Sequence, residues 1–204
     1  MSKPDFVSLS DLSSTIQINA NYAGEDNFTG QKVDGYRAKK ILLARVVAEA
    51  LLKVQAEALK LNLTLKIFDG YRPNKATLFF QKWSQLPEDN IQRKQRFYPS
   101  YAREELFAHG FIALKSSHSR GCAVDLTLAN IDTLQELDMG TEFDYFNDLS
   151  HTLNPEIQGR QLENRLLLKN LMEAQGFRNY SKEWWHFSFK QEPYPDVWFD
   201  FDIE

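Results

Sequence analysis

Hydrophobic residues recur at helical spacing through one long stretch of the chain, residues 36–61. Four charged residues of alternating sign follow one another there at intervals of four positions: Arg45, Glu49, Lys53 and Glu57. Such spacing predicts a single solvated stripe along a helix. Nearly every other position is apolar, so we expect a helix over residues 36–61 that is otherwise deeply buried.

The next segment changes to the alternation that is typical of a strand. Its apolar residues, Leu63, Leu65 and Ile67, are separated by polar ones, and Gly70 ends the pattern. Similar apolar runs predict three further strands, over residues 110–117, 121–129 and 183–189.

Helical patterns account for most of the remaining ordered sequence. A helix is expected to open at Pro73, where a proline is tolerated, and to continue to residue 86. Another helical region, residues 88–108, is broken by Pro99, and residues 159–175 form a third that stops at Gly176. Residues 1–35 and 130–158 read as irregular. Because helices and strands mix without regular βαβ alternation, we expect an α+β fold and a single domain over residues 1–204.

Composition narrows the classes of function. The formal net charge is −4, whereas a nucleic-acid partner usually requires a basic face, so none is expected. No run approaches the ~20 apolar residues of a membrane span, and no membrane partner is expected. The single cysteine rules out internal disulfides. The N-terminal segment has no apolar stretch of signal-peptide length, which favours a cytoplasmic location and leaves a periplasmic one open. No pattern in the sequence sets the oligomeric state.

One aspartate lies where a carboxylate is costly. Asp125 sits inside the apolar strand pattern of residues 121–129, and a buried carboxylate needs a positive partner. His118 precedes it by seven residues, and His186 lies in the aromatic strand pattern near the end of the chain. Two imidazoles and one carboxylate suit zinc and leave a fourth position for water. The alternative is that Asp125 pairs with a buried arginine or caps a turn.

Glu183 and Arg72 could supply the remaining chemistry of a hydrolase. A metal-activated water needs a base, and Glu183 precedes His186 by three residues, so we expect it just before the strand or at a bulge. Arg72, at the end of a predicted strand, could stabilise an oxyanion or bind a carboxylate. The plainer alternatives are a surface position for Glu183 and a salt bridge between Arg72 and Asp69 or another acid. Cys122 faces away from Asp125 by strand parity and is interpreted as a small core residue.

The combined pattern resembles a known family. "SSHSRGCAVDLTL", "EWWHF" and "FDGYRP" are similar to the zinc D-alanyl-D-alanine dipeptidases of the VanX type, within the zinc D,D-peptidases that share the Hedgehog-domain fold. The resemblance runs from about residue 20 to 190. It implies a small, mostly antiparallel sheet packed with helices.

The resemblance also implies roles for individual residues. It places the metal ligands of one zinc ion per chain on His118, Asp125 and His186, the catalytic base on Glu183, and a transition-state-stabilising arginine on Arg72. Two substrate-binding residues are implied in addition, both near the amino end of the substrate: Asp144 and Ser116.

The function that the resemblance implies is zinc-dependent hydrolysis of the small dipeptide D-alanyl-D-alanine to D-alanine. In that reaction metal-activated water attacks the peptide carbonyl and Glu183 acts as the base. The D,D stereochemistry comes only from the resemblance. Two alternatives are a D,D-carboxypeptidase that trims longer peptidoglycan stem peptides and a zinc-bearing binding module without catalysis.

Overall fold

A five-stranded sheet forms the centre of the molecule in the computed structural model, which describes residues 4–204. Its strands, in spatial order, are β2 (Gln17–Ile18), β4 (Leu63–Asp69), β5 (Ala123–Asn130), β7 (His186–Phe189) and β6 (Phe177–Asn179). Only the β2–β4 pair is parallel; the other three pairs are antiparallel. A small second sheet pairs β1 (Phe6–Ser8) with β3 (Leu42–Ala44). The structure thus confirms an α+β fold built on a small, mostly antiparallel sheet.

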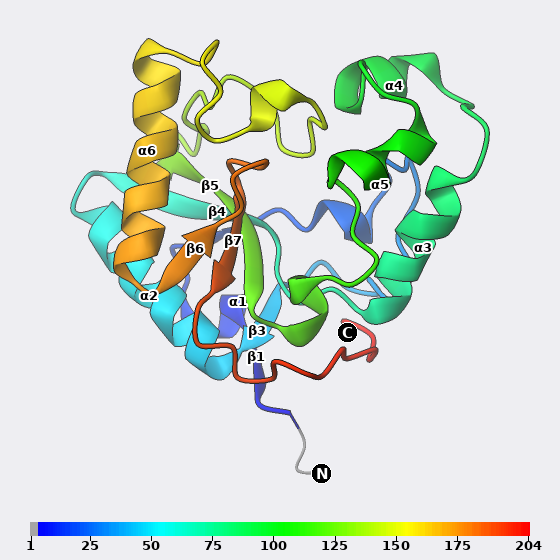
Figure 1. Cartoon of the computed structure of the whole chain (residues 1–204). Coiled ribbons are helices and arrows are strands. Elements are labelled where there is room, and N and C mark those ends of the chain that lie inside the picture. Colours follow the sequence, from blue (N-terminus) through cyan, green and yellow to red (C-terminus); the bar gives the residue numbers. More distant parts are fainter. Residues whose placement is uncertain (1–3) are drawn as a thin grey trace.

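Helices flank the sheet on two sides, as Figure 1 shows. The long helices α2 (Arg45–Leu59) and α6 (Gly159–Ala174) lie on one side, where α2 contacts β4 and α6 contacts β6. The other side carries three shorter helices: α3 (Asn74–Ser84), α4 (Ile91–Phe97) and α5 (Leu106–His109). A further short helix, α1 (Leu9–Leu12), follows β1. None of the helices within residues 4–204 has the length and apolar character needed to cross a bilayer.

The 3-10 turns of the chain lie in the connections between these elements. They are η1 (Asn21–Ala23), η2 (Arg103–Glu105), η3 (Ser117–Arg120) and η4 (Asp148–Ser150). Of these, η3 lies directly before β5 and carries one of the predicted metal ligands, His118. Ser116 begins this turn, and its Oγ accepts a hydrogen bond from the His118 amide at 3.2 Å, as an N-cap serine does.

Two predicted elements differ from the structure. The helix expected over residues 36–61 begins only at Arg45, because residues 42–44 form β3 and pair with the N-terminal strand β1. The strand expected over residues 110–117 is absent: Gly110 ends α5 in the left-handed region at φ 85°, and the following residues form bends. Leu114 in this segment is 72% exposed, so its apolar character does not mark a buried strand.

The sheet register determines which residues can form a site. Asp125 on β5 is directly opposite His186 on β7. On its other side Asp125 is opposite Asp69, where the β4–β5 register shifts by one residue after Ile67. Such a bulge redirects the side chains that follow it. Three polar residues from three adjacent strands therefore lie side by side, although they are far apart in sequence.

Candidate active site

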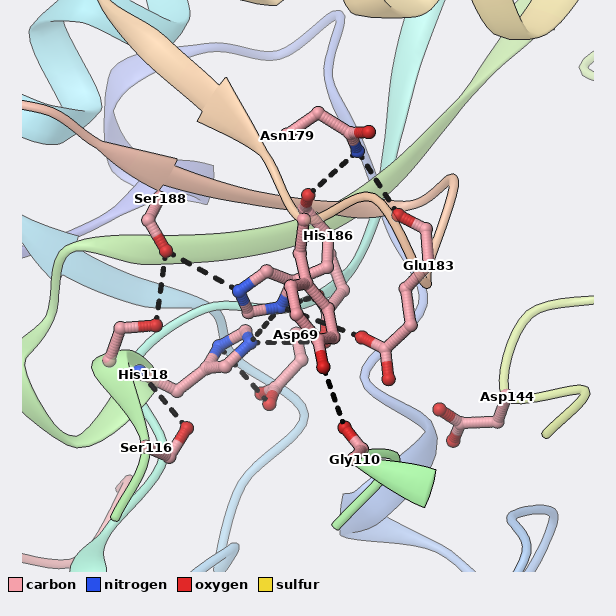
Figure 2. A network of polar contacts seen from close by, with 12 residues as sticks. Asp69, Gly110, Ser116, His118, Asp144, Asn179, Glu183, His186 and Ser188 are labelled. Atoms are coloured by element: carbon pink, nitrogen blue, oxygen red, sulfur yellow. Dashed lines mark hydrogen bonds and ion pairs between the residues drawn. The ribbon is translucent and has the colours of Figure 1, made fainter. Parts of the chain in front are cut away.

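The three predicted metal ligands converge on one point. His118 comes from η3, Asp125 from β5 and His186 from the start of β7. One potential ligand atom from each lies within 4.8 Å of the other two. His186 Nδ1 is 2.9 Å from Asp125 Oδ1, and His118 Nε2 is 3.2 Å from Asp125 Oδ2. The two ring nitrogens, His118 Nε2 and His186 Nδ1, are 3.1 Å apart. This arrangement could hold a metal ion, and the three side chains are called the metal-binding group below (Figure 2).

Hydrogen bonds and burial hold these side chains in the forms that bind a cation. His118 Nδ1 donates to the Gly70 carbonyl at 2.7 Å, so in a neutral ring Nε2 carries a lone pair that faces the group. Burial lowers the pKa of His186, which keeps its imidazole neutral, although Asp125 counteracts this effect. Burial alone would raise the pKa of Asp125, but His118 and His186 hold it well below its usual value. An ionised Asp125 carboxylate and the imidazole of His186 are therefore available as ligands beside Nε2 of His118.

Glu183 lies just before β7, as expected, and faces the same group. Only 8% of the residue is exposed, so it is not a surface residue. Its Oε2 lies 3.9 Å from His186 Nδ1. The turn is fixed by Asn179, whose side-chain amide donates to the carbonyls of Glu183 and His186, both at 3.0 Å (Figure 2). Burial, with Asp125 and Asp144 nearby, raises the pKa of Glu183 well above its usual value, so this carboxyl can hold a proton.

Arg72 both forms the salt bridge considered as an alternative and lies beside the metal-binding group. Its Nε and Nη2 are each 2.9 Å from Asp69 Oδ2, and Nη2 is 3.5 Å from Asp125 Oδ2. The guanidinium also lies over the rings of Tyr22 and Phe80, at 5.4 Å and 5.2 Å from their centroids. These contacts fix the direction of the guanidinium at the edge of the cavity.

Asp69 is a buried residue that the sequence offered only as one possible salt-bridge partner of Arg72. It is fully buried, and its Oδ1 accepts a hydrogen bond from the Tyr36 hydroxyl at 2.7 Å. Its Oδ2 is 3.6 Å from His118 Nδ1. A carboxylate at the end of a strand, three residues before an arginine, is the sequence signal that could have identified it. Through its contacts Asp69 links Arg72 to His118, one of the predicted metal ligands.

Asp144 is a buried carboxylate at another part of the site. Its backbone lies in the left-handed region at φ 60°, a conformation that non-glycine residues rarely adopt and that is concentrated at functional sites. The Tyr22 hydroxyl donates to Asp144 Oδ2 at 2.8 Å. Burial raises the pKa of Asp144 well above its usual value. Sequence reasoning missed Tyr22, which lies in a segment that was interpreted as irregular.

Ser116 does not lie beside Asp144. Figure 2 shows the two residues on opposite sides of the histidine pair. Ser116 is buried, and its hydroxyl oxygen already accepts a hydrogen bond from the backbone N–H of His118. The structure therefore separates the two residues that the family resemblance places near one end of the substrate.

These groups surround a cavity of about 280 Å³. Its polar wall includes Arg72, Asp125, Asp144, Glu183 and His186. Its apolar wall includes Phe28, Phe80, Phe111, Ile112, Phe146 and Trp185. This volume suits a small ligand, and the apolar rings reduce the access of water to the polar groups.

Cys122 takes no part in the site. It is fully buried, and its Sγ contacts the Ser117 carbonyl at 3.3 Å. Burial raises the pKa of the thiol to about 12, so it is protonated at neutral pH. A nucleophilic thiolate needs a lowered pKa, and the structure therefore supports the interpretation of Cys122 as a core residue.

Comparison with known proteins gives matches along nearly the whole chain. A family model described as D-ala-D-ala dipeptidase matches residues 2–204. A D-alanyl-D-alanine dipeptidase of Enterococcus faecalis is 41% identical over 198 residues, which are 97% of this chain and 98% of the relative. One of Streptomyces coelicolor is 42% identical over 199 residues, 98% of each chain. One of Escherichia coli is 33% identical over 187 residues, 92% of this chain and 86% of the relative.

Proposed function

The chain belongs to the D-ala-D-ala dipeptidase family, and from this premise we propose that it hydrolyses D-alanyl-D-alanine to D-alanine with one bound zinc ion. The observation that carries the proposal is the convergence of two imidazoles and a carboxylate, together with Glu183 and Arg72, on one small cavity. A cytoplasmic location and a single domain over residues 1–204 remain predictions from the sequence.

His118, Asp125 and His186 would hold the zinc ion. Their donor set of two imidazoles and one carboxylate suits zinc and leaves part of its usual four-ligand shell for other groups. When bound, zinc supplies Lewis-acid chemistry, since it polarises a carbonyl and lowers the pKa of water. The hydrogen bond from His118 Nδ1 to the Gly70 carbonyl keeps the ring in the ligating orientation.

Glu183 moves the proton. Its carboxylate takes a proton from the attacking water and holds it, which the buried position favours. The same carboxyl then delivers the proton to the amine of the departing D-alanine. The hydrogen bonds from Asn179 fix the turn that carries Glu183, so this step needs no rearrangement of the backbone.

The remaining side chains orient the substrate and stabilise charge. Arg72, held by Asp69, donates hydrogen bonds to the oxyanion that forms when water adds to the peptide carbonyl. The Asp144 carboxylate, with the Tyr22 hydroxyl beside it, binds the free ammonium group of the substrate. Requiring a free ammonium group in a cavity of about 280 Å³ limits cleavage to dipeptides.

A direct assay tests this function. Purified protein loaded with zinc is offered D-alanyl-D-alanine and, separately, a peptidoglycan pentapeptide that ends in the same two residues. We expect release of D-alanine from the dipeptide and little from the pentapeptide. Efficient cleavage of the pentapeptide would instead indicate a D,D-carboxypeptidase, and no turnover of either substrate would indicate a binding module.

A further inference from the structure

The charges in the wall of the cavity are unevenly distributed. The acidic residues that line the cavity are Asp125, Asp144 and Glu183, and the lysine and arginine residues that line it are Arg72 and Lys115. Arg72 is committed to Asp69 at 2.9 Å, beside the metal-binding group. Lys115 is therefore the cation of this wall that is left for an anionic group of a ligand.

The Lys115 ammonium contacts one aromatic ring. It lies 4.3 Å from the centroid of the Trp198 ring, a contact that leaves its N–H groups free to donate. Within residues 4–204 it has no carboxylate partner within salt-bridge distance. The backbone on both sides is fixed, because Gln81 Nε2 donates to the Leu114 carbonyl at 3.1 Å and Ser116 caps the η3 turn.

A second hollow extends the positive charge beyond His186. Its volume is about 410 Å³, and it shares Lys115 and His186 with the first cavity. Its walls also carry Arg120, Arg178 and Glu192. Arg120 is bound to Glu192 at 2.6 and 2.9 Å, so positive charge remains in excess on this side. The electrostatic potential there attracts an anion.

A dipeptide carries opposite charges at its two ends, which are only about 7 Å apart in an extended chain. If Asp144 binds the ammonium group, the carboxylate lies on the other side of the metal-binding group. Figure 2 shows Ser116, the residue after Lys115, on the opposite side of the histidine pair from Asp144. The two charged ends of the substrate then match the two charged ends of the site.

We propose that Lys115 binds the α-carboxylate of the dipeptide and makes the enzyme selective for substrates with a free carboxyl terminus. This inference rests on the proposed function. Lys115 contacts the substrate at its carboxyl end, away from the bond that is cleaved. Its contribution therefore belongs to substrate binding and to the choice between a free and a blocked carboxyl end.

The test compares Lys115→Met, Lys115→Arg and wild type on D-alanyl-D-alanine and on its C-terminal amide. Lys115→Met loses a hydrogen bond to a charged group, and this loss should raise the KM for the dipeptide about tenfold. The KM for the amide stays within about twofold, so the preference for the free acid disappears. Lys115→Arg, which keeps the charge, retains most of that preference. Lys53→Met on the exposed face of α2 is the matched control and matches wild type.

Other outcomes separate the two proposals. If Lys115→Met raised the KM equally for the free acid and the amide, the role of Lys115 would be merely structural and the inference would be overturned. No change in KM on either substrate would overturn it as well. If Lys115→Met does not fold, the inference is tested with Lys115→Arg and with the preference of wild type for the free acid over the amide. A wild type that shows no such preference would overturn the inference. Absence of dipeptide hydrolysis by wild type would contradict the proposed function instead.

Discussion

Replacing Asp69 with asparagine tests whether this buried carboxylate positions Arg72. Asparagine keeps the size of the side chain but removes its charge and one acceptor oxygen. Asp69 is fully buried and Arg72 is 14% exposed, so solvent screens their pair weakly. The variant therefore leaves the guanidinium without its nearest counter-charge, at 2.9 Å, and weakens the link to the Tyr36 hydroxyl.

The size of the effect follows from these contacts. Removing one partner of a buried ion pair typically costs about 3–5 kcal/mol of unfolding free energy. Burial raises the pKa of Asp69, so burying its ionised form costs free energy of folding, and the neutral asparagine side chain avoids this cost. In the variant, Arg72 still has a second counter-charge, because its Nη2 lies 3.5 Å from Asp125 Oδ2. We therefore expect the lower end, about 3 kcal/mol. Since losing one oxyanion donor lowers kcat about 10²–10³-fold, a misdirected but present Arg72 should lower kcat by about 10–100-fold.

The assay measures kcat and KM on D-alanyl-D-alanine, bound metal, and unfolding in urea. Asp69→Asn should lower kcat with metal retained and KM changed by no more than about twofold. The control is Asp202→Asn, which removes ion pairs with Arg37 at 2.6 Å and Lys75 at 2.8 Å in the C-terminal segment. That variant should keep wild-type kcat. A folded Asp69→Asn variant with wild-type kcat would refute the positioning role.

Two more predictions concern the proton carrier and the thiol. Glu183→Gln should retain the metal but lose about 10²–10⁴-fold in kcat, because the amide cannot accept the proton of water, and near-normal turnover with bound metal would contradict its assignment. Because burial raises the pKa of Cys122 to about 12, the thiol stays protonated below that pH. Iodoacetamide at pH 8 should therefore change neither the mass of the folded protein nor its activity, and alkylation accompanied by inactivation would refute this.

Local patterns predicted the elements whose burial matches their periodicity. The alternation in residues 62–69 and the apolar run of residues 121–129 correspond to the central strands β4 and β5. The helix over residues 159–175 corresponds to α6. The short strand β6 was missed because three residues carry little periodicity. The error over residues 36–44 has a tertiary cause in its last part, since residues 42–44 pair with the distant strand β1.

The candidate site could be predicted where residue chemistry was unusual for its local structure. An aspartate inside an apolar strand pointed to Asp125, and the structure places His118 and His186 beside it. Asp69, by contrast, becomes a neighbour of Asp125 only through a register shift between β4 and β5. The hydrogen bond from Tyr22 to Asp144 likewise spans 122 residues of sequence, and no local pattern announces it.

The most direct test measures bound metal and D-alanyl-D-alanine hydrolysis on the same samples of wild type and His118→Ala. Wild type should hold about one zinc ion per chain, lose zinc and activity together on chelation, and regain both when zinc is added. His118→Ala should fold, bind zinc far more weakly and show no such recovery. Full activity of metal-free wild type, or a normal zinc content in His118→Ala, would contradict the central claim that these three side chains hold the catalytic ion.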